Sequence, residues 1–125
     1  MKLNLEVSET LIWHDGPQLF VAIDSIGGLY LCLAAGDGYD EVPQYIAVAI
    51  SSVRLQALKA GKIDLYSIFK KPELNNWLGV DLTNNNHLTA RTYDVLEGLP
   101  DYLLPEPGVL LFNQPLLRYP ALISR

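Results

Sequence analysis

An uninterrupted apolar segment, residues 45–50, runs directly into a helix with its own start and stop signals, and few folds accommodate that combination. The segment reads YIAVAI, which has the length and β-branched content of a strand covered on both faces. Ser51 and Ser52 follow, and either hydroxyl can accept a hydrogen bond from the first turn of a helix. Residues 53–60 are mostly good helix formers, and Gly61 supplies the left-handed residue that commonly ends a helix.

A second, shorter helix is predicted after Asp64, whose carboxylate can cap its first turn. Leu65, Ile68 and Phe69 follow at the i, i+3 and i+4 spacing of one helical face. Pro72 disfavours helical geometry at the residue before it, so the helix ends there.

The buried stripe of the first helix is expected to contain Val53, Ala57 and Ala60, widened by Leu55 and Leu58. Burial of each large apolar side chain in these two helices would stabilise the fold by roughly 1.5–3 kcal/mol. The helical pair should therefore form the centre of a small core.

Alternating segments bounded by turn signals predict antiparallel strands on both sides of the helical pair. Residues 3–7 fit a short edge strand or a loose terminus. The other strands are expected at residues 18–24, 29–35, 77–82 and 88–96. The predicted class is α+β: a twisted antiparallel sheet, open or partly closed, built from a meander and a hairpin, with the helices inserted on one side.

The 125 residues are expected to form one domain, with a core at about residues 10–97 and an arm at about residues 98–125. Five of the eight prolines lie in this last part, and they exclude a continuous helix or a central strand. The arm is nevertheless apolar, so we expect it to pack on its own core or on a second copy. The side chains proposed for that contact are Leu110, Leu111, Phe112, Leu116 and Leu117.

Charge is distributed unevenly along the chain. The net charge is −5, whereas residues 51–71 alone carry +4. Arg54, Lys59 and Lys62 from this basic segment are proposed as part of an interaction surface, although a solvated helix surface is the simpler explanation, because exposed helix faces are commonly rich in lysine and arginine. The acidic balance argues against non-specific binding to nucleic acid or to an anionic membrane.

The chain offers few groups for catalysis. His14 and Asp15 are the only adjacent pair suited to acid–base chemistry, and Asp-Gly-Pro at a turn explains the aspartate structurally. Cys32 is the single cysteine and lies between leucines in a predicted strand, which is typical of a buried, unreactive thiol. A single cysteine allows no internal disulfide, and no apolar segment approaches the length of a membrane span, so a cytoplasmic location is expected.

Metal and cofactor sites are not predicted. Asp37, Asp40 and Glu41 lack the ligand spacing of an EF-hand and read as an exposed acidic turn. His87 follows three asparagines and lies far in sequence from the other histidine, so a zinc site would need carboxylates that the pattern does not place.

Several segments together resemble a small bacterial family of unknown function. They are VAIS at 48–51, RLQAL at 54–58, GKIDL at 61–65, PE at 72–73, DGPQLFVA at 15–22 and LLPEPG at 103–108. The chain departs from the family pattern at His14, where a tyrosine is usual, and at Tyr66, where an arginine is usual. The resemblance implies a shared fold and no particular chemistry.

Three hypotheses about function follow from the sequence. The favoured one is a small non-catalytic interaction or regulatory module that binds a protein partner or a second copy of itself. The second is an acidic immunity-like or antitoxin-like protein that binds a basic partner. The third is a small enzyme that uses His14 and Asp15.

Overall fold

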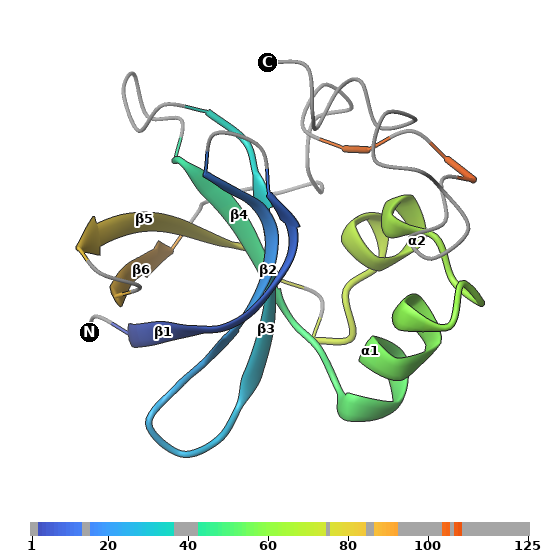
Figure 1. Cartoon of the computed structure of the whole chain (residues 1–125), viewed down its shortest axis with the longest axis horizontal. Helices are drawn as coiled ribbons and strands as arrows, with labels where there is room; N and C mark the ends of the chain where they lie inside the picture. Colours follow the sequence, from blue (N-terminus) through green and yellow to red (C-terminus); the bar gives the residue numbers. More distant parts are fainter. Residues whose placement is uncertain are drawn as a thin grey trace.

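The computed structural model describes residues 3–13, 16–36, 43–74, 76–84, 87–92, 104–105 and 107–108. Six antiparallel strands close into a barrel in the order β1 to β6, and two helices lie against one side of it (Figure 1). The elements are β1 (Leu3–Trp13), β2 (Pro17–Ile23), β3 (Leu29–Ala34), β4 (Tyr45–Ala49), α1 (Ser52–Lys59), α2 (Leu65–Lys70), β5 (Leu78–Asn84) and β6 (His87–Thr92). The predicted antiparallel α+β fold with inserted helices is confirmed, and the sheet is fully closed.

Closure of the barrel depends on β1, which is the strand that was predicted least accurately from the sequence. The prediction of a short edge strand or a loose terminus at residues 3–7 was wrong. β1 is 11 residues long and pairs with both β2 and β6. Its register shifts between Val7 and Glu9, between Thr10 and Ile12, and between Ile12 and Trp13, as β-bulges do when they bend a strand. Leu5 lies inside the barrel, whereas Ile12 lies on the side of the helices.

Two hydrophobic clusters lie on opposite faces of the barrel wall. The inner cluster consists of Leu5, Phe20, Ala22, Cys32, Tyr45, Ala47, Val80 and Leu88. The outer cluster joins the wall to the helices and contains Ile12, Leu19, Val21, Leu31, Leu33, Ile46, Val48, Ile50, Leu55, Leu58, Leu65, Ile68 and Phe69. Both faces of β2, β3 and β4 are therefore covered, which explains their nearly continuous apolar sequences.

The helices begin and end where the sequence signals place them. Ser51 is the N-cap of α1, and its hydroxyl accepts a hydrogen bond from the N–H of Arg54 at 3.1 Å. Asp64 is the N-cap of α2 and accepts from the N–H of Ser67 at 3.0 Å. Gly61 adopts a φ of 72° after α1, a conformation that favours glycine.

The stripe predicted for α1 was only partly correct. Leu55 and Leu58 are buried, but Val53 is 80% exposed and Ala60 is also exposed. Residues two apart on an α-helix differ in direction by about 200°, so Val53 points away from the core that Leu55 faces. The leucines alone define the buried side of this short helix.

Polar contacts fix the helical layer, meaning residues 51–74 with α1 and α2, to the barrel. The Lys59 ammonium pairs with the Glu9 carboxylate of β1 at 2.5 Å. The indole N–H of Trp77 donates to the carbonyl oxygen of Phe69 at 2.8 Å, which connects the end of α2 to the chain entering β5. The helices thus form one unit with the barrel wall beneath them.

Of the arm at 98–125, the structure describes only residues 104–105 and 107–108. Leu104 packs against the outer cluster, and the N–H of Gly108 donates to the Asp64 carboxylate at 2.5 Å. This part of the arm therefore lies against the helical layer.

Candidate functional site

The three basic residues proposed from the sequence have different surroundings. Arg54 donates from Nη2 to the carbonyl oxygen of Ser67 at 3.3 Å, so it holds α1 against α2 and is partly buried. Lys59 pairs with Glu9 on β1. Lys62 is exposed to solvent. Arg54 and Lys59 thus make contacts within the described chain, whereas the side chain of Lys62 is exposed, and a role for the three in binding stays a prediction.

Sequence reasoning missed a surface at the junction of α1 with the segment after α2. Val53 is 80% exposed and Leu74 is 68% exposed. Lys70, the last residue of α2, and Lys71, which follows it, are also exposed. We call Val53, Lys70, Lys71 and Leu74 the helical-layer patch. The signal that would have indicated it is the position of Val53, opposite Leu55 on the helix.

A hydrogen bond across the helical layer holds the two parts of this patch together. The backbone N–H of Ser51 donates to Oε1 of Glu73 at 2.8 Å. In a capping box, a glutamate three residues after the N-cap accepts this bond. Here Arg54 occupies that position and Glu73 replaces the glutamate from 22 residues away. The bond brings Leu74 toward the first turn of α1, which carries Val53.

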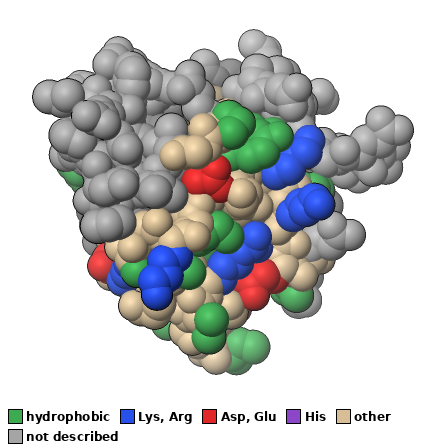
Figure 2. Space-filling view, turned by 90° about the vertical axis from the view of Figure 1, so that its right-hand side faces the viewer, with side chains coloured by type: hydrophobic (Ala, Val, Ile, Leu, Met, Phe, Trp, Pro, Cys, Tyr) green, Lys and Arg blue, Asp and Glu red, His purple; other side chains and the backbone are tan. Residues whose placement is uncertain are grey.

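The layer also concentrates positive charge. All five lysines and arginines of residues 51–71 belong to it, and Asp64 is the single acid of that segment. Figure 2 views this side of the molecule and shows basic side chains spread over the described surface, with hydrophobic side chains between them. Apolar groups surrounded by charged ones are typical of protein interfaces, which have an apolar centre and a polar rim.

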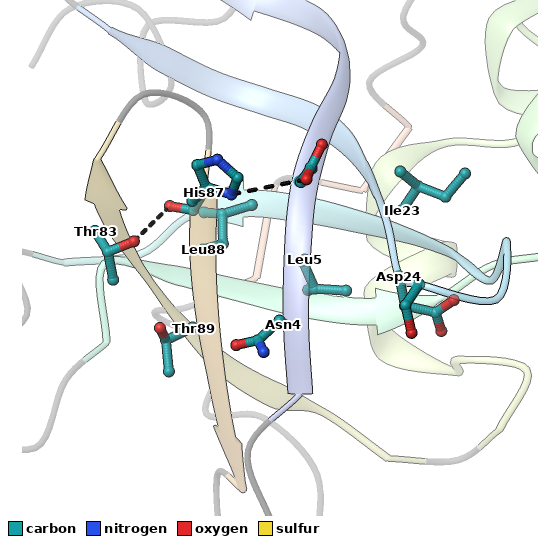
Figure 3. Close-up of a pocket in the computed structure, with 10 residues that line it drawn as sticks. Asn4, Leu5, Ile23, Asp24, Thr83, His87, Leu88 and Thr89 are labelled. Carbon is teal, nitrogen blue, oxygen red and sulfur yellow. Dashed lines mark hydrogen bonds and ion pairs between the residues drawn. The ribbon is translucent and has the colours of Figure 1, made fainter.

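A groove lies at the opposite end of the described structure, where β1 meets β6 and the end of β2 (Figure 3). Its volume is about 400 Å³. We call it the barrel-end groove. It is lined by Asn4, Leu5, Glu6, Ile23, Asp24, Ser25, Thr83, His87, Leu88 and Thr89.

Two acidic residues of this groove have described partners. Oε1 of Glu6 lies 3.8 Å from Nδ1 of His87, and both side chains are more than half exposed. Asp24 accepts hydrogen bonds from the N–H groups of Ile26 and Gly28 at 3.0 and 2.7 Å. Tyr30 lies 3.4 Å from the same carboxylate. Burial, together with the negative charge of Asp24, raises the pKa of the Tyr30 hydroxyl.

Cys32 is completely buried in the inner cluster, as expected from the sequence. Burial raises the pKa of its thiol well above the ordinary range. The neutral thiol is therefore the form present at physiological pH, and it fills space as a small apolar side chain does.

Several residues considered from the sequence lie outside the described part of the chain. They are His14, Asp15, Asp37, Asp40, Glu41, Leu110, Leu111, Phe112, Leu116 and Leu117. The roles suggested for them stay predictions. Among the residues that the structure describes, no group of three or more histidine, cysteine or acidic side chains could hold a metal ion. None of the described helices has both the length and the apolar character needed to cross a membrane.

Comparison with known proteins gives a family and a group of partial relatives. The profile of a family of unknown function, DUF6575, matches residues 3–116. Proteins named glucose-6-phosphate isomerase, from Listeria monocytogenes serotype 4b (strain F2365) and Listeria innocua serovar 6a (strain ATCC BAA-680 / CLIP 11262), are each 30% identical over 106 residues. Each match covers 85% of this chain and 21% of the relative. The chain thus spans about a fifth of these relatives, and no solved structure matches it.

Proposed function

The chain belongs to the family of unknown function DUF6575, and from this premise we propose that it is a small non-catalytic interaction module whose helical layer binds an acidic partner protein. The observation that carries the proposal is the helical-layer patch: Val53 and Leu74 are exposed on a layer that also carries exposed lysines and is fixed to the barrel. A preformed surface binds without a large cost for ordering its side chains and loops.

Charge indicates the kind of partner. The whole chain carries −5, but residues 51–71 carry +4 and present Lys62, Lys70 and Lys71 to solvent. An acidic surface would be attracted to this layer and repelled by much of the remaining molecule. Such complementarity mainly raises the association rate and fixes orientation. Val53 and Leu74 would then supply the apolar contact at the centre of the interface.

The described acidic groups favour a structural reading over a catalytic one. Asp64 and Glu73 accept hydrogen bonds at the first turns of the two helices, and Glu9 pairs with Lys59. Asp24 organises a turn. A general acid or base needs a carboxyl group directed at a substrate, and these four are directed at the chain itself. The isomerase activity named for the Listeria relatives belongs to proteins about five times longer than the matched segment.

A matched pair of variants tests the proposal. Val53→Asp places a negative charge in the helical-layer patch, whereas Ile26→Asp makes the same change at a side chain that is 91% exposed on the β2–β3 turn. Candidate acidic partners are captured from the native host, purified, and titrated against each protein. We expect Val53→Asp to weaken binding at least about tenfold, which corresponds to roughly 1.4 kcal/mol, and Ile26→Asp to bind as the unmodified chain does.

Two results would contradict this function. Equal loss of binding in both variants would show that the helical-layer patch is not the binding surface. Self-association that Val53→Asp abolishes, measured by sedimentation, would show that the partner is a second copy of the chain and not an acidic protein.

A further inference from the structure

The barrel has an incomplete seam beside the first residues of β1. The β1–β6 ladder extends to Leu3 paired with Ala90, but the β1–β2 ladder stops at Glu6 paired with Ile23. β2 ends there because Asp24 begins a tight turn, held by its hydrogen bonds to Ile26 and Gly28. Within the described ladders, residues 3–5 of β1 therefore have a neighbouring strand on one side only.

The barrel-end groove is lined from both sides of β1, and Ile23, Asp24 and Ser25 line it on the unpaired side. Figure 3 shows Asn4 and Leu5 of β1 in the middle of the lining, with Ile23 and Asp24 at the end of β2 on one side and the lining residues of β5 and β6 on the other. Successive residues of a strand direct their N–H and C=O groups to alternate sides. At least one of residues 3–5 thus directs its backbone donor and acceptor toward the seam. A volume of about 400 Å³ is within the range of ligand sites in proteins.

The lining of the groove limits the chemistry of its occupant. Glu6 and Asp24 line it, and none of the described lining residues is a lysine or an arginine, so this lining disfavours phosphate and other anions. The described lining also contains no phenylalanine, tyrosine or tryptophan on which an aromatic ligand could stack. Carboxylates beside an open strand edge suit a positively charged ligand with its own backbone hydrogen-bonding groups.

We propose that the barrel-end groove binds an extended basic peptide segment, which pairs with residues 3–5 of β1 as an added strand. In strand addition, backbone hydrogen bonds provide affinity and alternate side chains provide specificity. Side chains on one face of the added strand would reach the Glu6 carboxylate, and the negative charge of Asp24 at the end of β2 would add to the attraction. This site is separate from the helical-layer patch, so either proposal can fail without the other.

The probe for this site is a fluorescent hexapeptide in which lysine and valine alternate, titrated against the purified chain. We expect saturable binding that weakens as salt is added, because exposed charges are screened. Glu6→Lys reverses an exposed charge in the groove and should weaken binding about fivefold or more, as should Ser25→Lys from the other side of the groove. Gln56→Lys adds the same charge as Ser25→Lys at an exposed position of α1 and should bind within about twofold of the unmodified chain.

Hydrogen exchange and a competitor test the added strand itself. The bound peptide should slow amide exchange within residues 3–5, and spermidine, which has positive charges but no peptide backbone, should compete only weakly. Absence of binding at millimolar peptide, unchanged affinity in both groove variants, or equal loss in Gln56→Lys would overturn the site. Equally strong competition by spermidine would overturn the strand pairing.

Discussion

Replacement of Asp64 by alanine should destabilise the fold through two separate contacts. The carboxylate caps α2 through Ser67 and also accepts the N–H of Gly108 from the arm. Loss of an N-cap costs about 1 kcal/mol, and loss of a hydrogen bond to a charged group costs at least about as much again. We expect Asp64→Ala to lower the free energy of unfolding by roughly 2 kcal/mol in urea.

Asp64→Ser separates the two contributions. Serine is a good N-cap, so Asp64→Ser should recover about 1 kcal/mol of the stability that Asp64→Ala loses. Its hydroxyl is shorter than the aspartate side chain and has no charge, so it should not replace the carboxylate as the acceptor for the N–H of Gly108. A loss below about 0.3 kcal/mol in Asp64→Ala would refute the reasoning, since neither contact would then matter. Complete recovery in Asp64→Ser would show that the arm contact contributes nothing.

The pH dependence gives an independent check on the same carboxyl group. Partial burial alone would raise the pKa of Asp64, but hydrogen bonds from Ser67 and Gly108 outweigh it, and the pKa lies below its ordinary value. A lowered pKa means that the stabilisation is present above the unfolded pKa of about 3.9 and is lost as the pH falls through the folded value. The difference in stability between the unmodified chain and Asp64→Ala should therefore shrink below about pH 4. An unchanged difference down to pH 2 would contradict this.

The remaining predictions concern the core, the thiol and the relatives. Leu58→Ala should cost about 2–5 kcal/mol in urea unfolding because Leu58 is fully buried, whereas Val53→Ala on the same helix should change stability by less than about 0.5 kcal/mol. The Cys32 thiol should react with a chromogenic disulfide at pH 8 only after denaturation, because burial raises its pKa and blocks access of the reagent. Rapid reaction of the folded chain would contradict the burial of Cys32 in the inner cluster. The purified chain should not isomerise glucose 6-phosphate in a coupled assay, because the described carboxylates serve caps, turns and ion pairs; measurable turnover would overturn the non-catalytic reading.

The sequence predicted local structure well where a single residue type determines it. Ser51, Gly61 and Asp64 act through their own backbone geometry and hydrogen bonds, so their roles could be inferred without knowing the remaining fold. The alternation of side chains between the two faces of β3 also follows from local geometry: Leu31 and Leu33 lie on the side of the helices, and Cys32 lies inside the barrel.

The remaining features depend on contacts between distant segments. Closure of the barrel requires β1 to meet β6, a pairing of residues more than 80 positions apart that no local pattern indicates. The exposure of Val53 depends on which side of α1 the barrel covers. The Glu73 contact with Ser51 spans 22 residues. For these reasons the fold class was predictable, whereas the helical-layer patch and the barrel-end groove were not.

The claim at the centre of this account is that the helical layer is a recognition surface for an acidic protein. Its most direct measurement is the affinity of a purified acidic partner for the unmodified chain and for the triple variant Lys62→Glu, Lys70→Glu and Lys71→Glu. The account predicts a salt-sensitive complex for the unmodified chain and a loss of at least about a hundredfold in the variant, with the melting temperature nearly unchanged because all three lysines are exposed. Equal affinity for both proteins would contradict it.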